Sequence, residues 1–134
     1  MFRVFRGQNP ACLLRWYGTP RIDGLAMYPK GNLYIPASHG RLEAILKEPS
    51  GERRGIALVC HPHPLGGGTM HNKVVFRAAA GLVDAGLATL RFNFRGVGDS
   101  TGTHDEIAGG REDVRDALDY ITSEYANEDL TLAG

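Results

Sequence analysis

The sequence predicts an α/β fold in which a mostly parallel sheet is flanked by helices. Ile56–Cys60 is an unbroken apolar run, which is typical of a strand covered on both faces. Residues 73–85 place their apolar side chains along one stripe of a helix. Two more apolar runs follow, with a second amphipathic segment between them. This order of strand, helix, strand, helix and strand indicates parallel pairing with right-handed crossovers.

The centre of the chain is the strand, loop and helix between Gly55 and Gly86. Apolar residues of the helix are spaced as one face requires, at Val75, Ala79, Leu82, Val83 and Gly86. Asn72 is a suitable N-cap, and Gly86 is a suitable C-terminal stop. Open α/β sheets place ligand chemistry in loops that follow the carboxyl ends of strands. The loop between this strand and helix is therefore the first candidate for a functional site.

Further strands are predicted on both sides of this unit. Leu33–Ile35 and Leu42–Leu46 read as two short strands, joined by a turn at residues 37–40. Leu87–Phe94 and Leu130–Ala133 are apolar runs of the buried kind. We predict that Ile56–Cys60, Ala88–Phe94 and Leu130–Ala133 lie parallel and adjacent, with helices 73–85 and 112–125 as the crossovers.

The second helix is predicted over Glu112–Tyr125, after a long loop over residues 95–110 that contains five glycines. Its apolar stripe consists of Val114, Ala117, Leu118, Ile121 and Tyr125. The other face carries carboxylates at Asp113, Asp116, Asp119 and Glu124. We interpret them as a solvated face and not as a metal site.

Residues 1–31 differ from the rest of the chain. They show no clear period and are interpreted as an irregular or disordered extension, with residues 32–134 forming the domain. They hold five basic residues against the single acid Asp23: Arg3, Arg6, Arg15, Arg21 and Lys30. The basic residues are scattered, which favours a disordered start over a nucleic-acid-binding arm.

Composition limits the class of protein further. The chain has 134 residues, which is typical of one domain or part of one, and its net charge is zero. No nucleic-acid partner is expected, because the basic residues of the first 30 positions are scattered. Its two cysteines, Cys12 and Cys60, form no disulfide framework, so we expect a cytoplasmic setting. No apolar run is long enough to span a membrane, so no membrane partner is expected.

The loop His61–Gly68 reads H-P-H-P-L-G-G-G and carries the most unusual pattern of the chain. Its N–H groups could stabilise an oxyanion, except at Pro62 and Pro64, which have none. The alternative is a tight turn without a ligand. A zinc site at Cys60, His61, His63 and His71 is not expected, because neighbours on an extended strand point to opposite faces and no paired spacing exists.

Gly98–Gly102 matches the pattern G-x-S-x-G of a nucleophile elbow, but its context is wrong. An elbow turns directly from a strand into a helix, whereas Arg95–Val97 separate this match from the preceding strand. Ser100 is therefore interpreted as a residue of a Gly-rich turn that bonds local backbone. Two nucleotide-binding patterns also fail. Residues 66–70 lack the ending of a P-loop, and Thr101 stands where a dinucleotide fingerprint needs glycine.

Three segments together resemble the α/β-hydrolase superfamily, and most closely its small bacterial members with a His-Pro-His-Pro loop. The segments are LVCHPHPLGGGTMHNKVV, RFNFRGVGDSTG and LTLAG, in this order. The resemblance implies that His61–Gly68 is the oxyanion loop, with His61, His63, Leu65, Gly66 and Gly67 as its site residues. It implies a structural loop at Arg95, Gly96, Gly98 and Ser100. Many relatives have His-Gly where this chain has His61-Pro62, so the donating N–H stays open.

The resemblance also implies that Leu130–Ala133 leads to the nucleophile elbow and that Gly134 is the elbow's first glycine. The nucleophile, acid and catalytic histidine are expected after Gly134. The chain is thus expected to be the N-terminal half of a serine hydrolase acting on a small ester-like substrate, without cofactor or metal, and inactive alone. The alternative is a non-catalytic fragment, or a piece completed by another polypeptide. A third hypothesis is a nucleotide-binding α/β domain.

Overall fold

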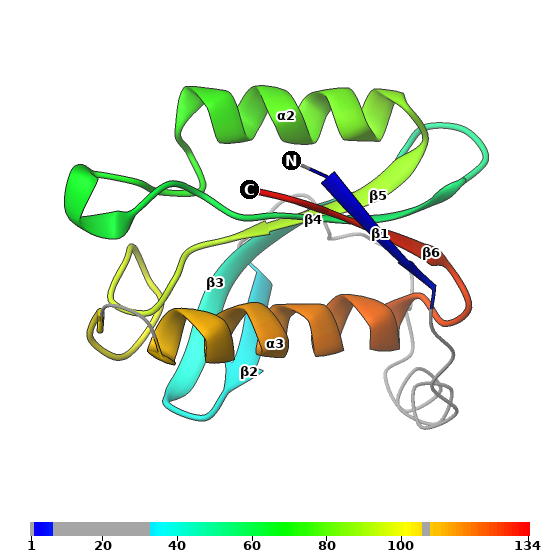
Figure 1. Cartoon of the computed structure of the whole chain (residues 1–134). Coiled ribbons are helices and arrows are strands. Elements are labelled where there is room, and N and C mark those ends of the chain that lie inside the picture. The colour runs from blue at the N-terminus through cyan, green and yellow to red at the C-terminus, as the bar shows by residue number, and fades with distance from the viewer. Residues whose placement is uncertain (1, 7–32, 106–107) are drawn as a thin grey trace.

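The computed structural model describes residues 2–6, 33–105 and 108–134, which form a six-stranded sheet with one helix on each face (Figure 1). The strand order is β1-β6-β4-β5-β3-β2. The elements are β1 (Phe2–Arg6), β2 (Leu33–Ala37), β3 (Gly40–Lys47), β4 (Gly55–Val59), η3 (Pro64–Gly66), α2 (Lys73–Asp84), β5 (Leu87–Phe92), α3 (Ala108–Glu124) and β6 (Asp129–Ala133).

The predicted α/β class and the parallel centre of the sheet are confirmed. β4 pairs in parallel with β5 on one side and with β6 on the other, and α2 and α3 are the crossovers. The whole sheet is mixed, because β2, β3 and β1 pair antiparallel. All five residues of β4 are buried, as its continuous apolar run requires.

Helix α2 begins where its sequence predicts and ends at Asp84, one residue before the predicted end. The Asn72 side chain accepts a hydrogen bond from the N–H of Val74, and Gly86 follows the helix with φ of 96°. Val75 and Ala79 form the buried stripe and pack with Val59 of β4 and Ala133 of β6.

Helix α3 begins at Ala108, four residues before the predicted start at Glu112. Its first turn contains Gly109 and Gly110, and glycine pairs are typical of a loop and unfavourable in a helix. A Cβ on Gly109 would lie 2.7 Å from the Arg95 guanidinium, so this glycine allows the loop to pack closely on the helix. The Asp105 carboxylate accepts a hydrogen bond from the Gly109 N–H at 2.7 Å and supports the first turn.

The interpretation of the α3 carboxylates as a solvated face is wrong for Asp113. Its side chain is completely buried and pairs with Arg95, at 2.8 Å from Nη2. A buried carboxylate needs such a partner because desolvation of an unpaired charge is costly. Periodicity could not reveal this, because the partner comes from a loop 18 residues earlier in the chain.

The interpretation of residues 1–31 as irregular is wrong for Phe2–Arg6, which form β1 and pair antiparallel with β6 from Phe2↔Ala133 to Arg6↔Asp129. The segment is short, and its apolar and basic residues do not alternate strictly, since Val4 and Phe5 are neighbours, so it carries no clear strand signal. Residues 7–31 lie outside the described residues, so their part of the prediction is not tested.

Candidate active site

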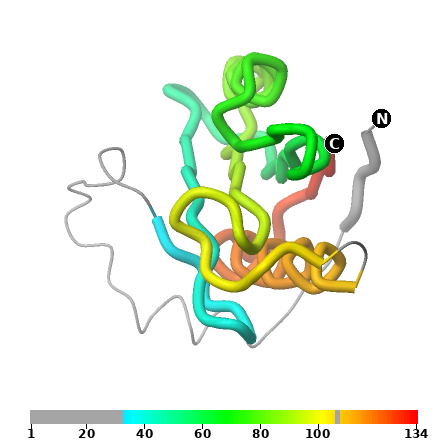
Figure 2. Tube along the Cα trace, turned by 90° about the vertical axis from the view of Figure 1, so that its left-hand side faces the viewer, coloured from blue at the N-terminus to red at the C-terminus, as the bar shows by residue number. Residues whose placement is uncertain are grey.

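The candidate site lies where the parallel strands end. The loop after β4, the loop after β5 and the carboxyl end of β6 gather at one end of the sheet (Figure 2). The Cys60 N–H donates to the Ala133 carbonyl at 2.9 Å, so the start of the His-Pro loop is attached to the end of β6. Open α/β sheets bind ligands at this edge.

His61 is buried and faces inward from the loop. Its Nε2 accepts a hydrogen bond from the Phe94 N–H at 3.2 Å, and its Nδ1 lies 2.6 Å from the Pro62 carbonyl. Because Nε2 is the acceptor, Nδ1 carries the proton. Burial lowers the pKa of His61 below 6.5, against the opposing effect of the Pro62 carbonyl. His61 therefore holds the loop as a neutral side chain, and neither ring nitrogen faces a ligand.

The N–H groups of the Gly-rich turn are already engaged. Gly66 and Gly68 donate to the His63 carbonyl, Gly67 donates to the Pro64 carbonyl, and Leu65 donates to His63 Nδ1 at 3.2 Å. These bonds form the short helix η3, which periodicity did not predict. Leu65, Gly66 and Gly67, three of the predicted loop donors, are thus used within the loop itself.

Within the described part of the chain, the His63 N–H has no acceptor. His63 has φ of −50° and ψ of 127° and stands between two prolines. Proline removes conformational freedom on both sides of it. Gly68 closes the loop, since a Cβ at this position would lie 2.0 Å from the Pro62 carbonyl oxygen. This close approach is what the run of glycines provides.

A largely apolar cavity of about 350 Å³ adjoins the loop. It is lined by Val59, Cys60, His61, Pro62, Val74, Val75, Ala78, Ala133 and Gly134. Burial raises the pKa of the Cys60 thiol to about 11, so this thiol is protonated at neutral pH. Among the residues that the structure describes, no group of three or more His, Cys, Asp or Glu could hold a metal ion. A larger groove of about 550 Å³ lies between the loop after β3 and the end of α2.

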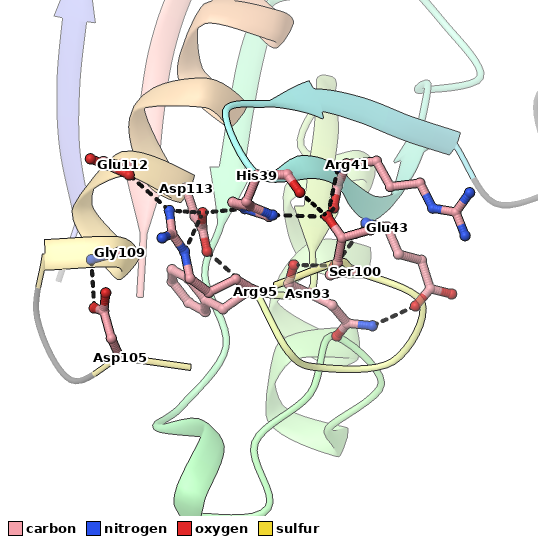
Figure 3. Close-up of polar contacts among 12 residues, drawn as sticks. His39, Arg41, Glu43, Asn93, Arg95, Ser100, Asp105, Gly109, Glu112 and Asp113 are labelled. Atoms are coloured by element: carbon pink, nitrogen blue, oxygen red, sulfur yellow. Dashed lines mark hydrogen bonds and ion pairs between the residues drawn. The ribbon is translucent and has the colours of Figure 1, made fainter. Parts of the chain in front are cut away.

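The predicted structural loop after β5 is held by two networks (Figure 3). In the first, Ser100 is buried. Its hydroxyl donates to the Asn93 carbonyl at 2.7 Å and accepts from the Glu43 N–H at 2.8 Å. Gly98 has φ of 55°, and a Cβ there would lie 2.4 Å from the Glu43 carboxylate. Ser100 is bonded to backbone on both sides and is not presented to a substrate.

In the second network, Arg95 pairs with Asp113 and with Glu112 at the start of α3. Hydrogen bonds to Asp113 raise the pKa of Arg95 above its usual range. The Gly96 N–H donates to the Thr101 carbonyl and closes the loop on itself. Arg95 and Gly96 therefore fix the shape of the loop and its contact with α3.

A third arrangement was missed by sequence reasoning. Thr101 Oγ1 lies 2.9 Å from His39 Nδ1, and His39 Nε2 lies 3.0 Å from Asp113 Oδ1. This hydroxyl–imidazole–carboxylate chain is similar to a catalytic triad, except that the two ring nitrogens exchange their partners. However, the hydroxyl also accepts from the Arg41 N–H, and a Cβ on Gly40 would lie 2.5 Å from it. The hydroxyl is thus engaged with the backbone of His39 and Arg41, and the chain of hydrogen bonds ties the β2–β3 turn to α3.

No protein-family model matches this chain. It is 42% identical, over 100 residues, to the uncharacterised protein RP471 of Rickettsia prowazekii, covering 75% of this chain and 42% of that protein. Within the described part of the chain, no helix is both long enough and apolar enough to cross a membrane.

Two solved structures match with closely similar backbones. An α/β serine hydrolase homologue from Coxiella burnetii gives a TM-score of 0.72 at 40% identity, with 75% of this chain and 49% of that chain covered. XC6422 from Xanthomonas campestris, an α/β serine hydrolase without a lid, gives 0.71 at 33% identity, with 78% and 50% covered. This chain therefore spans about half the length of the structures it matches. These neighbours are α/β serine hydrolase homologues, and they support the assignment of this chain to the α/β-hydrolase superfamily.

Proposed function

We propose that this chain is the part of a serine hydrolase of ester-like bonds that supplies the oxyanion loop. The nucleophilic serine, the acid and the catalytic histidine would be contributed by sequence beyond Gly134. The observation that carries the proposal is the His63 N–H. It stands in the loop after β4 without an acceptor among the described residues, while the neighbouring N–H groups are engaged in the turn.

In the proposed reaction a serine hydroxyl attacks the carbonyl carbon of the ester, and its proton passes to a histidine. The carbonyl oxygen becomes an oxyanion, which accepts a hydrogen bond from the His63 N–H and another from the residue after the serine. Expulsion of the alcohol leaves an acyl-enzyme, which water hydrolyses. Before attack the loop already has its shape, because η3, His61 and Gly68 hold it.

The rest of the proposal follows the same chemistry. The substrate is a small molecule with an ester-like bond, and no metal or resident cofactor takes part. The two loop residues Leu65 and Gly66 contribute shape and not hydrogen bonds to the oxyanion. A cytoplasmic setting stays part of the proposal, because two cysteines are too few for a disulfide framework.

The test uses two substitutions at His63 in a form of the chain extended by its downstream reading frame. His63→Pro removes the N–H and suits the backbone, since φ is already −50°. His63→Ala removes the side chain, keeps the N–H and serves as the matched control. We expect the extended form to turn over p-nitrophenyl acetate and to react with a fluorophosphonate. His63→Pro should lower kcat about a hundredfold relative to His63→Ala.

The 134-residue chain alone should hydrolyse this ester no faster than background, because it lacks a hydroxyl nucleophile held by a base. Robust turnover by the 134-residue chain would refute the proposal. Absence of turnover in the extended form would favour the alternative of a non-catalytic fragment. Equal kcat values for His63→Pro and His63→Ala would exclude the His63 N–H as the oxyanion donor.

A further inference from the structure

The far end of the His-Pro loop is held by side chains of one strand. Met70 is completely buried. Its N–H donates to Asn93 Oδ1 at 2.8 Å, and its carbonyl accepts from Arg91 Nη1 at 3.1 Å. Arg91 lies in β5 and Asn93 follows the strand, two residues apart on the same face. Both backbone groups of Met70 are thus bonded to the carboxyl end of β5.

The near end of the loop is attached to the same place. The Phe94 N–H donates to His61 Nε2 at 3.2 Å, and the two rings meet edge to face with centroids 4.9 Å apart. Asn93 and Phe94 are consecutive, so one dipeptide at the end of β5 holds both ends of the loop. Any change in the position of this dipeptide moves the His63 N–H between them.

Asn93 is itself oriented by a buried carboxylate. Its Nδ2 donates to Glu43 Oε2 at 2.8 Å (Figure 3). The same oxygen accepts from the Asp99 N–H at 2.8 Å. Because the nitrogen of the amide must face the carboxylate, its oxygen must face Met70. Ser100 completes the arrangement, since its hydroxyl accepts from the Glu43 N–H and donates to the Asn93 carbonyl.

We propose that Asn93, oriented by Glu43, is a positioning residue of the oxyanion loop. The catalytic consequence of this inference rests on the proposed function, whereas the effect of Asn93 on the position of the loop does not depend on it. Asn93 touches no substrate, and it acts through the Met70 N–H. The loop after β5 helps to orient this pair. The Asp99 N–H donates to the Glu43 carboxylate, and the Ser100 hydroxyl donates to the Asn93 carbonyl.

The test is a double-mutant cycle read by hydrogen exchange. Asn93→Asp keeps an acceptor for Met70 but sets a second carboxylate against Glu43. Glu43→Gln combined with Asn93→Asp exchanges the amide and the carboxylate and restores a donor–acceptor pair between the two side chains, while the Asp99 N–H loses its acceptor. We expect the peptide over residues 61–72 to exchange about tenfold faster in Asn93→Asp and to recover part of its protection in the double variant.

Ser123→Ala is the matched control, because it also removes a buried side-chain hydrogen bond, to the Tyr120 carbonyl in α3. It should leave residues 61–72 unchanged. Unaltered exchange of residues 61–72 in Asn93→Asp, or equal acceleration in Ser123→Ala, would overturn the proposal. So would effects of the two substitutions that simply add in the double variant.

The catalytic part is measured in the extended form of the chain. Asn93→Asp should lower kcat about tenfold with little change in KM, and the double variant should recover part of the lost kcat. Altered exchange with unaltered kcat would overturn the catalytic role while leaving the loop contact intact. Absence of turnover in the unsubstituted extended form would refute the proposed function alone, since the exchange experiment decides the positioning separately.

Discussion

At the scale of single residues, the two histidines of the loop differ in burial and in hydrogen-bond partners. His61 is buried, neutral and bonded through both ring nitrogens, whereas the His63 side chain is exposed and caps η3 through Nδ1. In the sequence the two histidines look equivalent, because each is followed by a proline. Only the three-dimensional neighbourhood, in particular the Phe94 N–H, separates a structural histidine from one whose backbone is available to a ligand.

The lowered pKa of His61 predicts a loss of stability in acid. The unfolded chain takes up a proton near pH 6.5, while the folded chain resists protonation to a lower pH. The unfolded state therefore binds more protons in this window, and the free energy of unfolding falls as the pH drops below 6.5. His61→Gln keeps an acceptor for Phe94 and cannot titrate. The melting temperature should fall more between about pH 7.5 and about pH 5.5 in the unsubstituted chain than in this variant. An equal fall in melting temperature for both proteins would contradict the lowered pKa of His61.

The Cys60 thiol should react slowly with alkylating reagents. Burial raises its pKa to about 11, so the thiolate fraction at neutral pH is very small. A Cys12→Ser variant isolates the signal of Cys60. We expect iodoacetamide at neutral pH to modify the folded variant at least about tenfold more slowly than the same variant in denaturant. Similar rates would show that Cys60 is a reactive thiol and would reopen its role in the site.

At the scale of elements, strands and helices were predictable where their apolar pattern is local. The five buried residues of β4 and the stripe of α2 follow from sequence spacing alone. The start of α3 and the burial of Asp113 were not predictable, because both depend on Arg95 from another loop. The candidate site was likewise predictable only in part. Its location follows from the motif, but the engagement of Leu65, Gly66 and Gly67 in η3 depends on turn geometry.

Two glycines should respond oppositely to alanine. Gly81 lies inside α2, and a Cβ there meets nothing within 4 Å. Gly81→Ala should stabilise the chain by about 0.5–1 kcal/mol, because alanine loses less backbone entropy in a helix. Gly98 has φ of 55° and faces the Glu43–Asn93 pair. Gly98→Ala should destabilise by about 2 kcal/mol or more through strain and displaced hydrogen bonds. Urea unfolding measures both, and a stabilising Gly98→Ala would contradict the role of this turn.

At the scale of the whole molecule, the sheet has two edges, β2 and β1. An uncovered edge strand exposes unpaired N–H and carbonyl groups to other chains. β2 carries Pro36, which limits pairing at its edge. At the other side, β1 covers the edge of β6. The prediction from sequence did not include this cover, since nothing local in residues 2–6 specifies a partner more than 120 residues away.

Removal of β1 should promote self-association. A form that starts at Leu33 exposes the edge of β6, which carries the apolar residues Leu130 and Leu132. Sedimentation velocity at increasing concentration should show dimers or larger species at lower concentration than for the whole chain. A form shortened only within residues 7–32, which keeps Phe2–Arg6, is the matched control. Identical sedimentation of all three forms would mean that β1 does not protect this edge.

The pairing of β1 with β6 also brings together the first and the last strand of the described residues. Phe2 lies opposite Ala133, and the strands run antiparallel, as N and C in Figure 1 indicate. The arrangement is that of a β-hairpin whose turn is open, and two residues suffice to close such a turn. If residues 134 and 1 were joined, the chain would continue from β6 into the neighbouring strand β1 of the same sheet. For the 134-residue form, a short turn between residues 134 and 1 would thus give a circular permutant, with new ends placed in an exposed loop elsewhere.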